Sequence, residues 1–586
     1  MRRQIISLAF SLASVALILV GIGYFYKVDV HTPTKLVPRA TVTPRPNPLP
    51  VALIVPHHQL VATQRAELFT QAATTGLKPK TIVLVSPNHY ESGSGAIQTT
   101  PQSWSTDAGI IDPDLDLIKR VEKDGVTEEI GSFTNEHGIR NILHDIAHTF
   151  PGAKIVPLII GSKATQSQAT KLADDISDVC PDCLVIASVD FSHYQPAKLG
   201  ELHDAVSIRA LDNLDLDTLT KVAEVDSPLS LVLASRFATD RAAGHFVLKN
   251  HTNSGVLVKD LDGEGTTHLF GWYEPGAKTV PAASVSFLLG GDIMLDRSVA
   301  DQYFFKNGGK FTQVVDKFSP RTFWGADLGM LNHEGPIASG PVDNNVTSNN
   351  LVFNFPPQSI DVVKALHVNA VSLANNHSLN AGQAGLENTR SVLTAAGVTP
   401  VGGPSDVDTV KALTISGQGI SLHVITVLTL DSNPDLSSLI KSLKQTASDR
   451  VLVFPHWGVE YQTTHSSGQA SQAHAWIDAG ADLVIGAHPH VVQDSELYKG
   501  VPIIYSMGNL IFDQGFSVET QRGMLVGGEF TDQGLRIFGL PVGIKSSAPS
   551  LLTGAEKATR LSRIYDPLKS SLRTTETGTE LYFPRP

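Results

Sequence analysis

The run VSFLLGGDIM, residues 285–294, carries the pattern that decides the fold: a short, continuously apolar segment that ends at a metal-ligand residue type, Asp292. Apolar runs of this length are typical of strands buried on both faces of a sheet. The arrangement recurs in ADLGMLNHE (326–334), VNAVSLANNH (368–377), RVLVFPHWGVE (450–460), DLVIGAHPH (482–490) and VPIIYSMGN (501–509). Because strand carboxyl ends form one edge of an open α/β sheet, where ligands bind, we expect these polar ends to converge on one crevice.

The side chains at these ends have the chemistry of metal ligands. The predicted ligands are Asp292, Glu334, Asn376, His456, His488 and His490. Oxygen donors combined with imidazole nitrogens suit Mn, Fe or Zn. A bridging carboxylate can hold two ions about 3.5–4 Å apart, which lowers the pKa of bound water and stabilises an in-line displacement. The sequence therefore predicts one or two divalent metal ions in this half; the alternative is that the residues are ordinary strand caps and turns.

Taken in order, these motifs resemble those of the CapA family. They are GDIM (291–294), NHEG (332–335), ANNH (374–377), HWGVE (456–460), GAHPH (486–490) and YSMGN (505–509). That family resembles the calcineurin-type metallophosphoesterases and is linked to poly-γ-glutamate capsule synthesis or export. The resemblance covers about residues 284–530. It implies a calcineurin-like metallophosphoesterase sandwich in which His377, Asp292 and Glu334 are catalytic, with His377 near the scissile bond.

Two functions for this half follow from these residues. The first is a metal-dependent hydrolase or transferase that acts on envelope phosphoesters or γ-glutamyl polymer. Here His377, which diverges from the adjacent Asn376, would serve as a general acid. The second is a component of capsule assembly or export whose metal site is structural. Met294 favours the second function, because the usual phosphoesterase motif is Asp-x-His and its nitrogen ligand is missing here. Expected partners are envelope polymer or capsule-synthesis proteins.

The first half also contains apolar runs that end at candidate ligand residues, but fewer of them. VALIVPHH (51–58), TIVLVSPNH (81–89) and LVIASVDFSH (184–193) are apolar runs that end in histidines. His57, His89 and His193 are therefore predicted to meet in one pocket and to hold one metal ion, with Asp190 orienting a ligand. The alternative is a set of structural histidines at loop starts.

With Asn135-Glu136-His137-Gly138, these motifs resemble the MEMO family, also called AmmeMemoRadiSam system protein B. The resemblance covers about residues 50–273 and implies the fold of the class III extradiol dioxygenases. Members often carry a cysteine after the last histidine motif, whereas this chain has Asp226-Ser227-Pro228 in the nearest region. That departure leaves metal or redox chemistry in this half open.

The expected fold class is α/β, with two α/β domains and mainly buried sheets. A MEMO-like domain is expected at 51–275 and a CapA-like domain at 284–545, followed by a C-terminal tail at 546–586. Residues 28–50 are rich in proline and read as an extended linker. Residues 1–27 include the uncharged apolar run Ile5–Tyr26, long enough to span a bilayer. It predicts an uncleaved signal anchor, and hence a single-pass protein of the cell membrane with an extracytoplasmic body; a cleaved signal peptide is the alternative.

Composition excludes some classes of function. Charged residues make up 17% of the chain and hydrophobic ones 42%, which predicts a folded protein. The net charge of -12 gives no basic footprint for nucleic acid. Cys180 and Cys183 lack the second pair that a thiolate zinc site needs, which leaves a redox pair, a local disulfide or two inert thiols. His144 and His148 have zinc-protease spacing, but the acid between them is Asp145, and an exposed helix face is expected.

Overall fold

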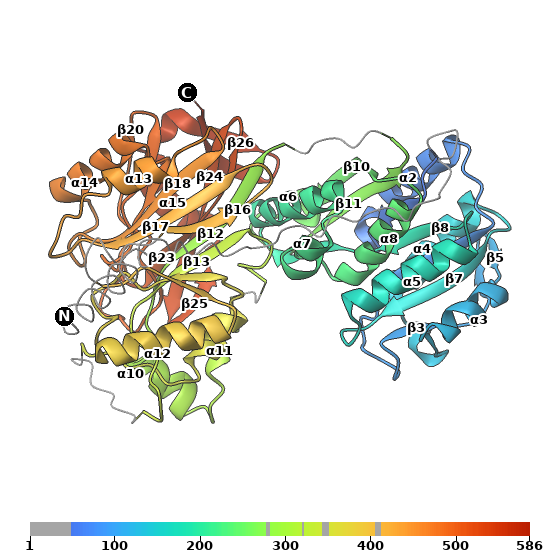
Figure 1. Ribbon diagram of the computed structural model, residues 1–586, viewed down its shortest axis with the longest axis horizontal. Coiled ribbons are helices and arrows are strands. Elements are labelled where there is room, and N and C mark those ends of the chain that lie inside the picture. The colour runs from blue at the N-terminus through green and yellow to red at the C-terminus, as the bar shows by residue number, and fades with distance from the viewer. Residues whose placement is uncertain (1–48, 277–281, 319–320, 343–350, 405–411, 586) are drawn as a thin grey trace, which may run out of the picture.

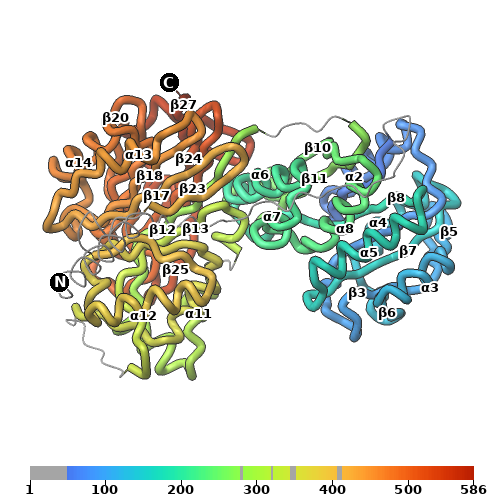
Figure 2. The backbone as a smooth tube through the Cα atoms, viewed as in Figure 1, coloured from blue at the N-terminus to red at the C-terminus, as the bar shows by residue number. Residues whose placement is uncertain are grey.

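Two α/β halves, joined near residue 280, make up the computed structural model shown in Figure 1. The structure describes residues 49–276, 282–318, 321–342, 351–404 and 412–585. The backbone trace in Figure 2 separates the first half, blue to green, from the second, yellow-green to red. A mixed α/β fold with several sheets was predicted from the apolar runs, and the structure has it.

The first half is built on one sheet with the strand order β10-β11-β1-β8-β2-β7-β3-β6, in which β9 also pairs with β11. The central strands β1, β8, β2 and β7 are parallel, and their residues are almost completely buried. The strands are β1 (Ala52–Val55), β2 (Thr81–Pro87), β3 (Ile97–Thr99), β6 (Thr127–Glu128), β7 (Lys154–Ile160), β8 (Leu184–Ser188), β9 (Phe191–Gln195), β10 (His245–Asn253) and β11 (Gly265–Glu274). A separate hairpin pairs β4 (Trp104–Thr106) with β5 (Gly109–Ile111).

Helices cover both faces of this sheet, as continuous apolar strands require. One face packs against α2 and α4, and the other against α3, α5, α7, α8 and the end of α6. The helices are η1 (Gln59–Val61), α2 (Ala62–Thr74), α3 (Leu115–Lys123), η2 (Gly131–Phe133), α4 (His137–Thr149), α5 (Gln166–Val179), α6 (Ala197–Asn213), α7 (Leu216–Lys221), α8 (Pro228–Asp240) and α9 (Ser254–Val258).

The second half contains two sheets packed face to face. Their strand orders are β15-β14-β13-β12-β23-β24-β27-β26, with β22 on β12 and β25 on β24, and β16-β17-β18-β19-β21-β20. The first sheet contains β12 (Ser284–Ile293), β13 (Leu328–His333), β14 (Ala370–Ser372), β15 (Thr399–Val401), β22 (Asn509–Ile511), β23 (Arg522–Thr531), β24 (Gly534–Lys545), β25 (Ala548–Leu551), β26 (Leu572–Thr575) and β27 (Gly578–Pro584). The second contains β16 (Ala412–Ser416), β17 (Ser421–Leu428), β18 (Asp449–His456), β19 (Leu483–Ile485), β20 (Ser495–Tyr498) and β21 (Val501–Ile504).

Three apolar clusters hold this half together. One lies between the two sheets, one on the outer face of the first sheet beneath α11 and α12, and one on the outer face of the second beneath α13 and α14. The helices are α10 (Arg297–Ala300), η3 (Asp301–Phe305), η4 (Phe311–Val315), α11 (Ser359–Ala365), α12 (Gly382–Ala395), α13 (Ser437–Leu443), α14 (Ser467–Ala479), α15 (Gly554–Tyr565) and η6 (Lys569–Ser571).

The segment expected to be a tail belongs to the second half's sheet. Strand β27 pairs with β24 along Leu581 to Pro584, and β26 pairs with β27. Leu581 and Phe583 enter the core between the sheets. The domain therefore extends beyond residue 545. The sequence did not indicate this, because pairing between distant strands leaves little trace in a mixed polar sequence.

Helix α6 joins the two halves (Figure 1). Its residues Leu199 and Leu202 are buried in a core cluster of the second half. The buried Lys198 pairs with Glu580 at 2.5 Å across the same boundary. Apolar burial and a buried ion pair therefore both link the two halves at this boundary.

The prediction of a transmembrane anchor, and with it of a single-pass cell-membrane protein, is corrected. Among the residues that the structure describes, no helix is long and apolar enough to span a bilayer. The longest of them, α6, has 17 residues, short of the roughly 20 apolar residues that a span needs. Ile5–Tyr26 lies outside the described residues, and its apolar composition was the whole basis of the prediction.

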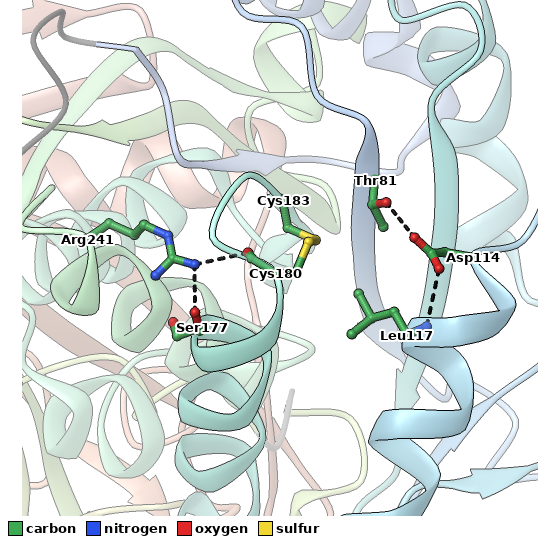
Figure 3. Close-up of a disulfide and its surroundings, with 7 residues drawn as sticks. All are labelled: Thr81, Asp114, Leu117, Ser177, Cys180, Cys183 and Arg241. Atoms are coloured by element: carbon green, nitrogen blue, oxygen red, sulfur yellow. Dashed lines mark hydrogen bonds between the residues drawn. A yellow bond between two sulfur atoms is a disulfide. The ribbon is translucent and has the colours of Figure 1, made fainter. Parts of the chain in front are cut away.

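Cys180 and Cys183 form a disulfide, which settles the three alternatives for this pair (Figure 3). Cys180 caps the C-terminus of α5, whereas a redox pair would place its first cysteine at a helix N-terminus. The Arg241 guanidinium donates to the carbonyls of Ser177, at 3.1 Å, and of Cys180, at 3.0 Å. The disulfide thus closes the turn between α5 and β8.

Candidate functional site

The candidate site of the second half lies where parallel strands of both sheets end. Asp292 is in the last two residues of β12, Glu334 follows β13, and His456 is the last residue of β18. Strand β13 runs parallel to β12, and β19 runs parallel to β18. The turn after β19 carries His488 and His490, so the strand ends that the sequence predicted to converge do lie together.

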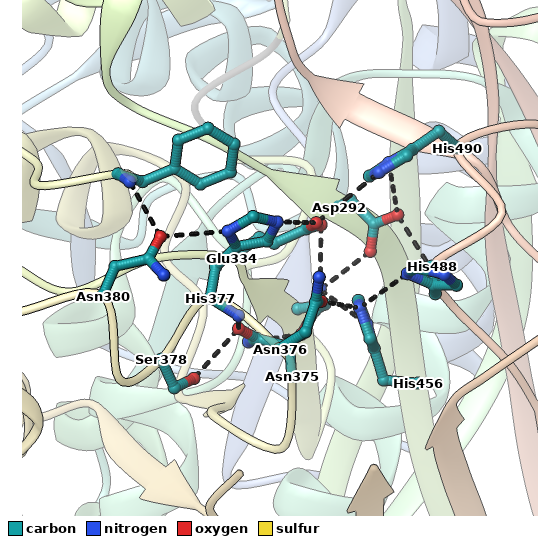
Figure 4. Close-up of polar contacts among 12 residues, drawn as sticks. Asp292, Glu334, Asn375, Asn376, His377, Ser378, Asn380, His456, His488 and His490 are labelled. Carbon is teal, nitrogen blue, oxygen red and sulfur yellow. Dashed lines mark hydrogen bonds and ion pairs between the residues drawn. The ribbon is translucent and has the colours of Figure 1, made fainter. Parts of the chain in front are cut away.

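Asp292, Glu334 and His490 form one buried group whose candidate ligand atoms lie within 4.8 Å of one another (Figure 4). The His490 Nδ1 atom is 3.2 Å from Asp292 Oδ2, and its Nε2 atom is 3.6 Å from Glu334 Oε1. Two carboxylates thus face the two nitrogens of one imidazole.

The remaining predicted ligands, His456 and His488 of the second sheet and Asn376 after β14 of the first, contact one another beside this group. The His456 Nε2 atom lies 3.1 Å from His488 Nδ1 and 2.9 Å from Asn376 Oδ1. The His488 backbone N–H donates to Asp292 at 3.3 Å. All six side chains predicted as ligands are therefore neighbours.

Two residues of the site were missed. Glu460 forms a second possible metal group with His488 and His490. Asn332 donates to Asp292 at 2.8 Å and to Glu334 at 3.3 Å. Asn332 lies two residues before Glu334, and Glu460 lies four residues after His456, each inside a motif already identified. Position within the motif was therefore the signal that could have found them.

The charges of the site are strongly coupled. Burial opposes protonation of His490, but Glu334 and Asp292 outweigh it and raise its pKa to about 9. Burial raises the pKa of Glu334 well above its ordinary value. Burial and the nearby His490 lower the pKa of His488 to about 4, and burial with the nearby His488 lowers the pKa of His456 well below its ordinary value. The last two imidazoles are therefore neutral near pH 7, the form that binds metal.

The donor set fits a divalent cation. Glu334 Oε1 is buried and has no hydrogen-bond partner within the described residues. An uncompensated buried carboxylate is costly, and a cation compensates it. His488 and His490 have φ values of 96° and 57°, a region that non-glycine residues adopt rarely and that recurs at functional sites. The strained turn brings both imidazoles to the same edge.

His377 lies beside this group rather than in it. Its ring stacks on Phe353 at 4.1 Å, and its Nε2 atom is 3.9 Å from Glu334 Oε1. Its Nδ1 atom lies 3.0 Å from Asn380 Oδ1, which also accepts the Phe353 backbone N–H. Nδ1 must therefore donate, so Nε2 is the atom that can exchange a proton toward the site. Burial lowers the pKa of His377.

Met294 stands where the usual phosphoesterase motif has its histidine. It is fully buried, and its sulfur accepts the Asp296 backbone N–H at 3.2 Å. The side chain packs in the core cluster of this half. The position therefore contributes packing, and the metal group is completed from the other sheet by His488 and His490.

In the first half, His57 lies at the centre of the candidate site. Its Nε2 atom is 3.2 Å from both Asp190 Oδ2 and Asp226 Oδ2. Burial opposes its protonation, but Asp190 and Asp226 prevail and raise its pKa. Asp190 was expected to orient a ligand rather than to be one. In the structure Asp190 faces His57 Nε2, and Ser188 Oγ faces the opposite nitrogen of His57, Nδ1, at 3.3 Å. Asp190 is thus a potential ligand itself.

His89 approaches the same place from β2. Its Nδ1 atom is 2.5 Å from Glu136 Oε1, and its Nε2 atom is 3.7 Å from Asp226 Oδ2. His57, His89 and His137 form one possible metal group, and His57, Asp190 and Asp226 form another. Asp190 Oδ1 and Asp226 Oδ1 are buried without a hydrogen-bond partner in the part of the chain that the structure describes. This donor set also fits a cation.

His193 belongs to neither group, although it was predicted to meet His57 and His89. It lies on β9, with Nδ1 3.6 Å from the buried Glu224 and 3.5 Å from Arg321 of the second half. Asp226 and His137 were the missed residues; His137 was within the motif Asn135-Glu136-His137-Gly138, whereas Asp226 had no local signal.

The protease-like pair His144 and His148 lies on an exposed face of α4. The His144 side chain is 53% exposed and pairs with the exposed Asp107. Asp145, the acid between the histidines, is buried and pairs with Arg65 at 2.6 Å. Asp145 is therefore held away from the two histidines, and they form no protease site.

Comparison with known proteins divides the chain at the same boundary. The family model of the bacterial capsule synthesis protein PGA_cap matches residues 286–514, and that of the Memo-like proteins matches residues 22–229. The capsule biosynthesis protein CapA of Bacillus anthracis is 28% identical over 302 residues, 47% of this chain and 71% of that protein. The PGA biosynthesis protein CapA of Bacillus subtilis is 28% identical over 294 residues, 47% of this chain and 76% of that protein. A MEMO1 family protein of Caldivirga maquilingensis is 30% identical over 191 residues, 31% of this chain and 67% of that protein.

Proposed function

Because the chain belongs to the MEMO family in its first half and to the CapA capsule synthesis family in its second, we propose a metal-dependent function in capsule metabolism. The second half would be a hydrolase or transferase that acts on envelope phosphoesters or on γ-glutamyl polymer. Its partners would be that polymer or the proteins that make it. The first half would hold one divalent ion, and its activity is left open.

The observation that carries this proposal is the buried group of Asp292, Glu334 and His490. Two carboxylates and an imidazole without solvent would be costly as a purely structural feature. With His456, His488 and Asn376 they offer oxygen and nitrogen donors, a set that suits Mn, Fe or Zn. Glu460 would extend the group toward a second ion.

Bound divalent ions would supply Lewis-acid activation of water and would stabilise developing charge. The protein's own residues would orient the proton donor, His377, and supply the proton. Asn380 and Phe353 hold the His377 ring so that Nε2 faces Glu334. His377 would protonate the leaving oxygen from Nε2, as a general acid. Its lowered pKa makes the protonated ring a stronger acid, although a smaller fraction is protonated at neutral pH.

A second candidate function is supported by Met294. The buried methionine removes one nitrogen ligand that the usual phosphoesterase motif provides. The site would then be a structural metal centre in a component of capsule assembly or export. The two functions differ in whether the full chain turns over any ester or amide.

Kinetics of two histidine variants would separate these functions. With a phosphodiester and a γ-glutamyl amide as substrates, His456→Ala should lose metal and activity together. His377→Ala should keep its metal and lose about 10²–10⁴-fold in turnover, less for leaving groups that need no proton. His474→Ala is the matched control, since that histidine lies on the outer helix α14 and pairs there with Glu496 of β20. If His377→Ala empties the site while His456→Ala leaves it full, these roles are wrong. If the wild-type chain turns over no substrate, the assembly function is favoured.

A further inference from the structure

A cavity of about 540 Å³ opens beside the candidate site of the first half. His89 and Asp226 line one part of it, together with the polar residues Asn88, Ser162 and Thr220. Cavities of about 300–1,000 Å³ are the size that small molecules occupy in proteins. The cavity is therefore large enough for a small ligand next to His89.

One residue that lines this cavity comes from the other half of the chain. Arg321, from the second half, lines the cavity, and its side chain is 29% exposed. Its guanidinium pairs with the fully buried Glu224, which also accepts the His193 backbone N–H. The guanidinium carbon lies 5.5 Å from the Trp324 ring. Arg321 is thus fixed in the wall by a carboxylate and an aromatic ring.

The acidic side chains of the cavity are already engaged. Glu91 accepts the Ser162 backbone N–H at 2.7 Å, and Asp226 faces His57 and His89. An arginine that lines a cavity favours an oxyanion, because its planar guanidinium matches carboxylate and phosphate in a two-pronged hydrogen bond. The charge of a ligand would therefore lie at Arg321.

Helix α6 of the first half contacts the segment next to Arg321. The buried His203 of α6 has its Nε2 atom 3.2 Å from the Thr322 carbonyl, one residue from Arg321. Arg209 of the same helix pairs with Asp327 at 2.5 Å. Helix α6 therefore contacts the segment that follows Arg321 at two points.

We infer that this cavity is a ligand site shared by the two halves: it binds a small oxyanion-bearing molecule, whose carboxylate or phosphate group pairs with Arg321 while its other end reaches His89 and Asp226. The first half alone has an incomplete site, and the fusion supplies the anion-binding residue. This inference is independent of any activity of the second half.

Calorimetric titration of the full, chelator-treated chain with glutarate and with inorganic phosphate tests the inference. The wild-type chain should bind at least one probe, and the tighter probe identifies the oxyanion as carboxylate or phosphate. The double variant Arg321→Ala/Glu224→Gln removes both charges without leaving Glu224 buried and unpaired. It should bind the probe at least about 10-fold more weakly, the cost of losing a charge-assisted hydrogen bond.

Arg536→Ala is the matched control. Arg536 also forms an ion pair across the boundary, with Glu201 at 2.5 Å, is 22% exposed, and does not line the cavity. It should bind the probe as the wild type does. Ala164→Leu, which narrows the cavity without touching the Arg321 ion pair, should weaken binding and covers the case in which the double variant fails to fold. Unchanged binding in the folded double variant or in Ala164→Leu, or no binding of either probe to the wild type, would overturn the inference.

Discussion

Replacing Glu334 by Gln should weaken metal binding in the second half strongly while leaving its fold almost unchanged. Burial raises the pKa of Glu334 and so favours its neutral form in the metal-free protein, a form that glutamine matches in shape and charge. The metal-free unfolding free energy should therefore change by less than about 1 kcal/mol. A divalent ion, by contrast, needs the ionised carboxylate.

The size of the metal effect follows from linkage. At 100 times its dissociation constant, an ion that binds the native state stabilises it by about 2.7 kcal/mol. If losing one anionic ligand weakens binding 100-fold, the same ion concentration gives about 0.4 kcal/mol. For a domain of this size, 1 kcal/mol moves the melting temperature by about 2–4 °C. The metal-induced shift should fall from about 5–10 °C to about 1 °C.

The assay is thermal unfolding of the full chain after chelation, with and without added Mn or Zn. Glu496→Gln is the matched control, because it makes the same change at a carboxylate that pairs with His474 and Tyr505 away from the candidate ligands. It should keep the full metal-induced shift. A full shift in Glu334→Gln, or none in the wild type, would refute the reasoning.

Three further predictions concern stability. Replacing Cys180 and Cys183 by serine opens a loop with a sequence separation of 3 and should cost about 2 kcal/mol of unfolding free energy in a urea titration; no change would argue against the disulfide. Burial opposes protonation of His251, but its partner Asp204 raises the pKa of His251 above 6.5. The stabilisation from this pair is therefore complete below about pH 6.5 and is lost as the pH rises through the raised pKa. His251→Gln should flatten that part of the stability profile, and an unchanged profile would contradict the prediction. Lys198→Met should cost about 3 kcal/mol, because it leaves the buried Glu580 without its lysine partner at the boundary, whereas Lys171→Met, at a lysine that is 61% exposed, should cost under about 1 kcal/mol; equal costs would contradict the buried pairing.

The strands of the second half and the convergence of its candidate metal ligands could be predicted because each candidate ligand lies at or just after the end of an apolar run. Lys154–Ile160 and Leu184–Ser188 coincide with β7 and β8, since continuous apolar runs have few alternatives inside a sheet. Asp292 and Glu334 needed no knowledge of the loops, because strand direction brings the ends of β12 and β13 to one edge of the first sheet. His456 joins them through the packing of the second sheet on the first, which the sequence did not specify.

What sequence could not give depends on contacts between distant segments. Asp226 reaches His57 from a loop far along the chain, and Arg321 reaches the first half's cavity from the second half. Strand β27 joins its sheet by pairing with β24, although its sequence is mixed. None of these has a local pattern of hydrophobicity or spacing, because the packing of whole elements decides them.

That the second half binds divalent metal through its strand-end residues is tested most directly by counting metal ions per chain. His490 belongs to both possible metal groups of this half. The full chain, purified after exposure to Mn or Zn, is compared with His490→Ala by elemental mass spectrometry, with His474→Ala as the control. The variant should contain one or two ions fewer per chain than the wild type and the control. Equal metal content in His490→Ala and the wild type would contradict the proposed metal centre.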